Sequence, residues 1–146
     1  MYATAQDIIE RYTLDELIVI SNSDNDTSDD YDVTQVSRAL EDASSEIDGW
    51  LRHCYDTPVS MPLVGKFSQL TAICVDIAVC RLGFSMQVAT DEKDQRYDKA
   101  IKRLGLLCPK AKQVMSGKVE NLGATGKARL MGGKRMFSRQ SQRELL

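Results

Sequence analysis

The stretch from Phe67 to Thr90 constrains the fold more than any other part of the chain. It carries only two charged residues, Asp76 and Arg81, and its apolar residues recur every three or four positions, which is the period of an α-helix. Further apolar residues lie off this stripe, so the helix is hydrophobic on much of its circumference. We therefore predict a central helix, or one packed against a second subunit. The stripe comprises Leu70, Ile73, Cys74, Ile77, Cys80 and Phe84.

A membrane-spanning helix is the alternative for this stretch. Asp76 and Arg81 would then lie near the bilayer centre, where charged side chains are costly, and the flanks lack aromatic anchors. We therefore predict a helix that packs against protein. The N-terminus has no basic segment followed by an apolar run, so we expect no secretory signal and a protein that stays in the cytoplasm of its cell.

Helical signals also occur on both sides of this stretch. Thr4 and Thr13 each precede an acidic residue by three positions, which is the spacing of a helix N-cap. Gly105 is placed to end the last helix of the series. The predicted helices are residues 4–12 and 13–20, as two short helices or one bent helix, then about Val33 to Tyr55, and Thr90 or Asp91 to Gly105.

Charge divides the chain into an acidic body and a basic arm. Residues 1–109 hold 10 Lys and Arg against 19 Asp and Glu, a net charge of −9, whereas residues 110–146 hold 9 against 2, a net charge of +7. The glycine-rich composition after Pro109 cannot build a core of its own. We predict an all-α body of about four helices at 1–109 and a long extended arm at 110–146. The arm suits nucleic acid or an acidic protein surface, including another copy's body.

The four cysteines show no C-x-x-C pairing, and three of them fall in apolar or helical settings. We therefore interpret all four as small, reduced, hydrophobic side chains. Cys74 and Cys80 are six positions apart, about 240° around a helix, so they cannot bind one zinc ion together. The remaining two are Cys54 and Cys108.

The loop from Ser21 to Asp32 is acidic and nearly free of apolar residues. Its spacing superficially resembles a calcium-binding EF-hand loop, but Asp29 stands where that turn needs glycine, and Gln35 stands where a bidentate Glu belongs. We favour a solvated acidic linker that caps the next helix, and predict no metal site.

Catalytic signals are weak. His53, the only histidine, has no Ser or Asp arrangement that suggests a triad, and we interpret it as a surface residue near a helix end. The segment GATGKARL lacks the glycine spacing and the Ser or Thr of a phosphate-binding loop. We predict no catalytic residue, no cofactor and no enzymatic activity.

Several segments, taken in order, resemble one protein family across most of the chain. They are MYATAQDIIERY, ASSEIDGWLRHCYDTP, VDIAVCRL, RYDKAIKRL, GKVENLG and FSRQS. Together they look like the small protein encoded near the major head subunit of Mu-like phages and prophages. The long acidic loop and Pro109, where uninterrupted helix is expected, depart from that pattern.

The resemblance implies a structural virion protein at the head-to-tail junction, made in the host cytoplasm. It is similar to the small helical adaptors that assemble as a ring, commonly dodecameric, beneath the portal and extend the DNA channel. The implied partners are the portal protein, a tail-proximal neck or stopper protein, and further copies of the chain. DNA passes through the lumen without sequence-specific binding, and no membrane is involved.

Within that hypothesis we assign roles to three groups of residues. Portal docking is assigned to an apolar anchor and three arginines of the arm, with a disordered basic tail as the alternative: Arg135, Phe137, Arg139 and Arg143. Subunit packing is assigned to five residues, with ordinary core and solvated surface as the alternative: Asp48, Trp50, Arg52, Arg96 and Tyr97. The acidic loop faces either the DNA lumen or the tail and contains Asp24, Asp26, Asp29 and Asp30.

A DNA-binding regulator that uses the basic arm on phosphates is the other functional alternative. Its affinity would fall steeply as salt rises. The acidic body and the lack of a convincing helix-turn-helix argue against it.

Overall fold

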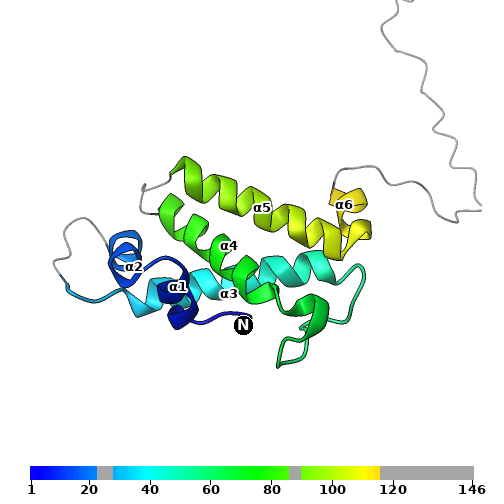
Figure 1. Cartoon of the computed structure of the whole chain (residues 1–146), viewed down its shortest axis with the longest axis horizontal. Helices are drawn as coiled ribbons and strands as arrows, with labels where there is room; N and C mark the ends of the chain where they lie inside the picture. The colour runs from blue at the N-terminus through cyan, green and yellow to red at the C-terminus, as the bar shows by residue number, and fades with distance from the viewer. Residues whose placement is uncertain (23–27, 86–89, 116–146) are drawn as a thin grey trace, which may run out of the picture.

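The computed structural model describes residues 1–22, 28–85 and 90–115 (Figure 1). These residues form six α-helices and one short 3₁₀-helix, with no β-strand among them. The predicted all-α fold is confirmed, although six helices are found in place of about four. The helices are α1 (Ala5–Arg11), α2 (Leu14–Ser21), α3 (Val33–Leu51), the 3₁₀-helix η1 (Gly65–Phe67), α4 (Leu70–Ser85), α5 (Asp91–Leu107) and α6 (Pro109–Met115).

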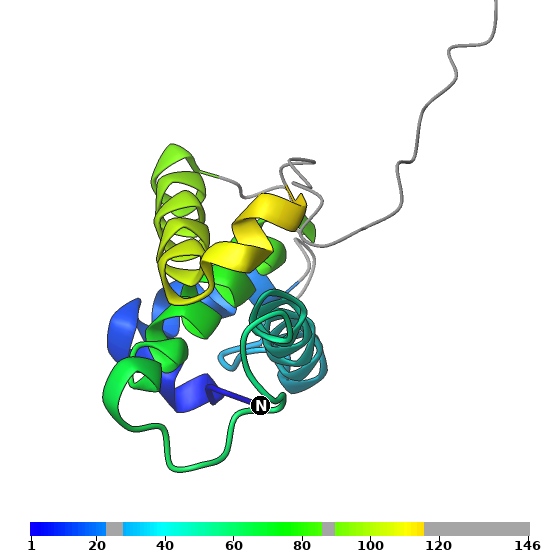
Figure 2. The ribbon, with the colours of Figure 1, turned by 90° about the vertical axis from the view of Figure 1, so that its right-hand side faces the viewer.

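Helix α4 lies at the centre of the bundle, as the sequence predicts. It packs against α1, α2, α3 and α5, and Figure 2 shows it between the long helices α3 and α5. Val75, Val79 and Leu82, which lie off the predicted stripe, are also buried, so α4 is covered on nearly all sides. Phe84 is an exception. It is 62% exposed because it falls in the last turn of α4, and its place in the buried stripe was wrong.

The length and composition of the Gly65–Ser85 segment would suffice to cross a membrane. Within the described structure, however, 61% of the most apolar 18-residue stretch of this segment is buried under the other helices of the bundle. A core helix of a water-soluble bundle has the same properties.

The predicted helix starts are made by side-chain caps. The Thr4 hydroxyl accepts a hydrogen bond from the Asp7 amide, and the Asp7 side chain binds back to the Thr4 amide, forming a complete capping box. The Thr13 hydroxyl accepts from the Glu16 amide in the same way. Asp32, at the end of the acidic loop, caps α3 as the sequence predicts.

The end of α5 differs from the prediction. Gly105 lies inside the helix, which continues to Leu107, so glycine does not end it. The helix stops at Cys108 because the next residue is Pro109, and a residue before proline is disfavoured in the helical conformation. Pro109 then occupies the first position of α6, where its missing N–H costs nothing. Ala111 of α6 is fully buried and belongs to the core.

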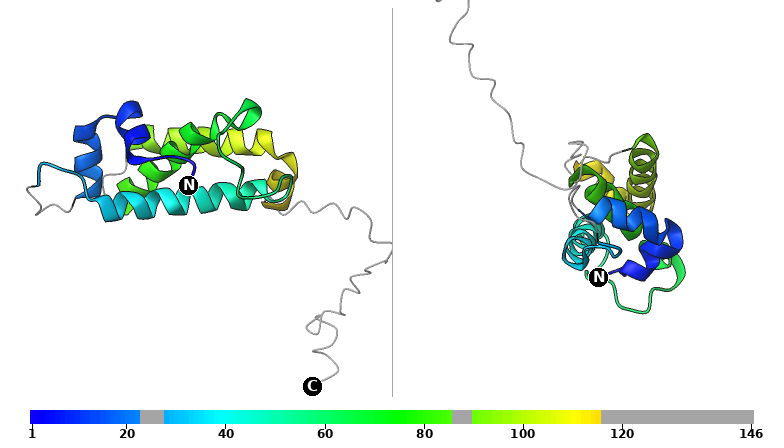
Figure 3. Two further views of the ribbon diagram at one scale, coloured as in Figure 1. Left: turned by 90° about the horizontal axis from the view of Figure 1, so that it is seen from below. Right: turned by 90° about the vertical axis from the view of Figure 1, so that its left-hand side faces the viewer.

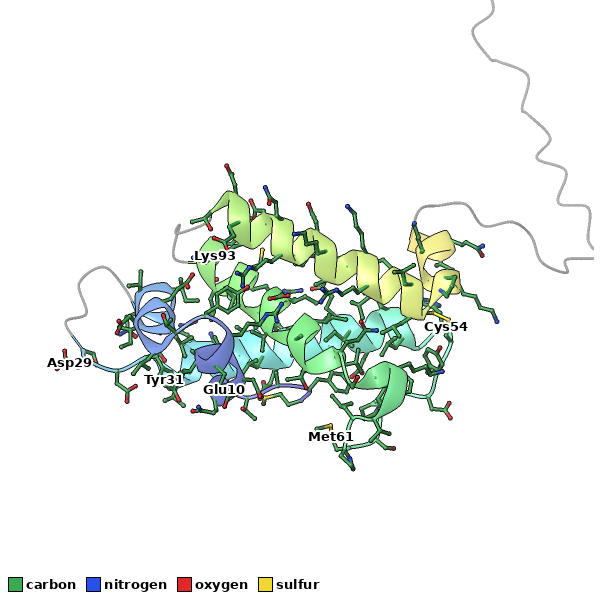
Figure 4. All side chains as sticks on the ribbon, viewed as in Figure 1. Glu10, Asp29, Tyr31, Cys54, Met61 and Lys93 are labelled. Atoms are coloured by element: carbon green, nitrogen blue, oxygen red, sulfur yellow. A yellow bond between two sulfur atoms is a disulfide. The ribbon has the colours of Figure 1, made fainter. Side chains whose placement is uncertain are left out.

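The helices are distributed unevenly along the bundle. Helices α1 and α2 lie near one end, and α6 lies at the opposite end (Figure 3). At the α6 end, Cys54, which follows α3, forms a disulfide with Cys108 between α5 and α6 (Figure 4). The expectation that all four cysteines are reduced is therefore wrong for this pair, because residues 54 positions apart in sequence meet only in the folded chain. Cys74 and Cys80 are free and buried, as predicted.

Reduction of the Cys54–Cys108 disulfide is expected to destabilise the oxidised protein by about 4 kcal/mol, because the unfolded chain regains the entropy of a 54-residue loop. Urea unfolding with and without dithiothreitol measures the change. The double variant C54S/C108S serves as the control and should not respond to the reductant. An equal response in both proteins would show that the disulfide does not contribute to stability.

Candidate functional site: a groove beside Trp50

One carboxylate is buried in the core of the bundle. Asp76 of α4 is 3% exposed and accepts two hydrogen bonds from the Arg11 guanidinium, from Nε at 2.8 Å and from Nη2 at 2.9 Å. The Tyr12 hydroxyl donates a third at 2.9 Å. A buried charge needs such pairing to be tolerated, so this cluster attaches α1 to the central helix.

A second set of charges attaches α5 to the N-terminal helices. Lys93 is buried, with 7% of its surface exposed, and its ammonium lies 3.2 Å from the Glu16 carboxylate of α2. The Arg96 guanidinium lies over the Tyr12 ring at 4.7 Å. Figure 4 shows Lys93 near α2, at the end of α5 opposite Cys54. Among the described residues, no buried side-chain nitrogen or oxygen lacks a hydrogen-bond partner. We interpret these charges as structural.

Hydrogen bonding and burial change the ionisation of three tyrosines. Burial, followed by the charge of Asp76, raises the pKa of Tyr12 to about 12. Burial and the hydroxyl's hydrogen bond to Asp48 raise the pKa of Tyr2 to about 12. Burial and a hydrogen bond to Glu46 do the same for Tyr97. All three hydroxyls therefore stay protonated donors at neutral pH.

The surface between α3 and α5 is hollowed into two adjoining pockets, which together we name the α3–α5 groove. Trp50, Ile101 and Lys102 line both pockets. The pocket of about 310 Å³ extends toward α6 and is completed by Gly105, Leu106 and Lys112. The pocket of about 500 Å³ extends along α3 and is completed by Glu46, Gly49, Tyr97 and Asp98.

The groove has an apolar floor and a charged group at each end. Trp50 and Ile101 are half-buried in it, and Leu106 is 81% exposed beside them. Glu46 and Asp98 line only the pocket along α3, Lys112 lines only the pocket toward α6, and Lys102 lies between them. Glu46 is already paired with Arg81 and accepts a hydrogen bond from the Tyr97 hydroxyl. An exposed apolar surface with a charged rim is typical of a site for protein contacts.

The structure brings together two of the five predicted packing residues. Trp50 and Tyr97 line the groove. Asp48 instead accepts a hydrogen bond from the Tyr2 hydroxyl, Arg52 is an exposed residue at the C-terminal end of α3, and Arg96 pairs with Glu92 at 2.8 Å. These three residues therefore lie away from the groove lining.

The other predicted groups lie partly or wholly outside the described residues. In the acidic loop, Asp29 and Asp30 are exposed, and the Asp30 carboxylate accepts a hydrogen bond from the Tyr31 amide at 2.8 Å. The predicted residues that lie outside the described part of the chain are Asp24 and Asp26 of the loop and Arg135, Phe137, Arg139 and Arg143 of the arm.

Of the ten residues that line the groove, sequence reasoning assigned only Trp50 and Tyr97 to subunit packing. Leu106 and Lys112 were missed because the expected end of α5 at Gly105 separated them from the packed body. The Cys-Pro sequence at 108–109 was the available signal, because proline favours the first position of a new helix. Among the described residues, no group of three or more His, Cys, Asp or Glu is arranged to hold a metal ion.

Comparison with known families identifies the chain's relatives. The family model described as "Bacteriophage Mu, Gp36" matches residues 2–128, a range that includes all six helices and the whole groove. The chain belongs to the bacteriophage Mu Gp36 family. The resemblance to a Mu-like phage protein is thereby confirmed, and this Gp36-family chain is a bacteriophage protein. No curated protein matches it.

In this Gp36-family protein, Arg11→Ala is expected to lower the free energy of unfolding by about 3 kcal/mol, because it leaves the Asp76 carboxylate buried without its counter-charge. This value is at the low end for buried pairs because Arg11 is itself partly exposed, with 36% of its side chain accessible. Urea unfolding followed by circular dichroism measures the loss. Arg103→Ala, at an exposed position of α5, is the matched control, and equal losses in both variants would contradict a special role for the Asp76 pair.

The raised tyrosine pKa values predict an alkaline loss of stability in the Gp36-family fold. Because the folded pKa of Tyr12 is about 12 against an ordinary 10.0, its contribution is complete below pH 10 and is lost as the pH rises toward 12. Tyr12→Phe should therefore show a smaller loss of stability between pH 10 and pH 12 than the unmodified chain. Chemical unfolding across that range tests this. If the variant and the unmodified chain lost stability equally over this range, Tyr12 would have the same pKa in the folded and unfolded states.

Proposed function

We propose that this phage protein is a head-tail connector, a structural adaptor that forms a ring beneath the portal and extends the DNA channel toward the tail. The observation that carries the proposal is the α3–α5 groove. This groove is apolar and exposed, with a lysine at its α6 end and carboxylates at its other end. Such a surface is suited to contacts between unlike faces of neighbouring copies. Contacts between unlike faces close into rings when the rotation permits.

The distribution of charge supports the same arrangement. With α6 counted in the folded body, residues 1–115 hold 12 Lys and Arg against 19 Asp and Glu, a net charge of −7, and residues 116–146 hold 7 against 2, a net charge of +5, so the body of one copy attracts the arm of another. A ring built in this way repeats one heterologous contact. DNA in its lumen meets a mainly acidic body, which agrees with passage of DNA without sequence-specific binding.

We assign the end of the arm to the portal. Phe137 supplies an apolar anchor, and Arg135, Arg139 and Arg143 supply directional contacts to carboxylates. A tail-proximal neck or stopper protein binds the opposite side of the ring, and the exposed Asp29 and Asp30 belong to the lumen or tail side. The role is structural, without enzymatic activity, cofactor or membrane contact.

Negative-stain electron microscopy of the full-length chain mixed with the portal protein of the same phage tests this function. We expect a ring that caps the portal. The variant R135E/R139E/R143E should no longer bind the portal protein, although its circular-dichroism spectrum should remain helical. The variant K127E/R129E/K134E changes the same charge elsewhere in the arm and should still bind.

Two results would contradict the proposal. One is a full-length chain that stays monomeric and never binds the portal. The other is a gel shift with duplex DNA that weakens steeply between two salt concentrations, which would favour the DNA-binding regulator.

A further inference from the structure

The α6 end of the groove presents two lysines without a carboxylate partner. Neither Lys102 nor Lys112 forms an ion pair within the part of the chain that the structure describes. Both stand beside the apolar surface of Trp50 and Leu106, and Leu106 is 81% exposed. This combination fits a short peptide segment with apolar side chains on either side of a carboxylate.

The chain itself contains such a segment outside the described residues. After α6, residues 116–146 hold only two acidic residues, Glu120 and Glu144. Glu120 lies between Val119 and Leu122, in the sequence Val-Glu-Asn-Leu. The family match at residues 2–128 includes this segment together with every groove residue, and it ends before Glu144.

The length of chain before the segment limits where it can reach. Val119 is four residues beyond Met115, the last residue of α6, and four extended residues span roughly 14 Å. Val119 can therefore contact only surfaces within that distance of Met115, the end of α6. Because Lys112 of α6 lines the groove, two copies that meet at this end bring the segment of one to the groove of the other.

We propose that residues 119–122 of one copy bind in the α3–α5 groove of the neighbouring copy. Val119 and Leu122 cover Trp50 and Leu106, and the Glu120 carboxylate pairs with Lys102 and Lys112. The donor segment and the acceptor groove are unlike surfaces, so the contact is heterologous and can repeat around a ring. The inference rests on the proposed ring and names the contact that joins its subunits.

Trp50 gives a direct readout because it is the only tryptophan of the chain. On concentrating the full-length protein, we expect its emission to shift to shorter wavelength and its quenching by acrylamide to fall, as assembly is detected by sedimentation. Leu122→Asp should weaken assembly by about a hundredfold, since it places a charge in the apolar contact. Leu130→Asp, elsewhere in the arm, is the matched control and should assemble normally.

Mixing two variants separates a neighbour's segment from the chain's own. L122D keeps Trp50 and an intact groove, while W50F keeps an intact arm and is silent in tryptophan fluorescence. Adding W50F should restore the short-wavelength emission of L122D, because only the arm of the other chain can fill that groove. Emission that is already shifted in dilute unmodified protein, and that mixing fails to restore in L122D, would show that the segment fills its own groove and would overturn the proposal.

Charge reversal tests the pairing of Glu120. Glu120→Lys and Lys112→Glu should each weaken assembly by about tenfold, and combining them in one chain should recover most of the loss. If Glu144→Lys weakened assembly and Glu120→Lys did not, the groove would bind the segment around Glu144, and the proposal would be overturned.

The portal-binding test and the Trp50 test can each contradict one proposal without contradicting the other. A portal-capping ring formed without any change at Trp50 would overturn the groove contact alone. A concentration-dependent change at Trp50 without portal binding would leave the groove contact standing and overturn the connector function.

Discussion

The Asp76 carboxylate lies in the middle of the helix against which the rest of the bundle packs. A charge there is tolerated because Arg11 and Tyr12 supply three hydrogen bonds to it. Those residues come from the end of α1, so the pairing fixes α1 against α4, and Arg96 over the Tyr12 ring extends the contact to α5. This pairing holds α1 and α5 against α4. Helices α3 and α5 both pack on α4 and also contact each other, and the groove lies on the surface where α3 meets α5.

The sequence predicted the parts of the fold that depend on nearby residues. Helix period identified α3, α4 and α5, and the caps at Thr4, Thr13 and Asp32 are confirmed because a cap joins residues two or three positions apart. The central place of α4 followed from apolar residues around its circumference. Asp76 was recognised only as an obstacle to a membrane span, since its partner lies 65 residues away in the sequence and no local pattern points to it.

Apart from Phe84, the errors share one cause, which is contact between distant segments at the α6 end. The pairing of Cys54 with Cys108 and the inclusion of Leu106 and Lys112 in one groove both require α6 to fold back onto the bundle. The expected helix end at Gly105 hid that possibility. Trp50 and Tyr97, which the sequence assigns to subunit packing, both line the groove, whereas Asp48 does not, because two residues two positions apart on a helix lie on different faces.

The groove depends on packing more than on the disulfide beside it. A disulfide persists only in oxidising surroundings, but Cys108 and Ala111 are fully buried, and the Tyr55 hydroxyl donates a hydrogen bond to the Leu107 carbonyl at 3.0 Å. These contacts hold the α5–α6 junction against the segment after α3 whether or not the sulfurs are bonded. The lysine-lined end of the groove can therefore exist in a reducing cytoplasm and outside the cell alike, and the disulfide adds stability to a shape that the burial of Cys108 and Ala111 already determines.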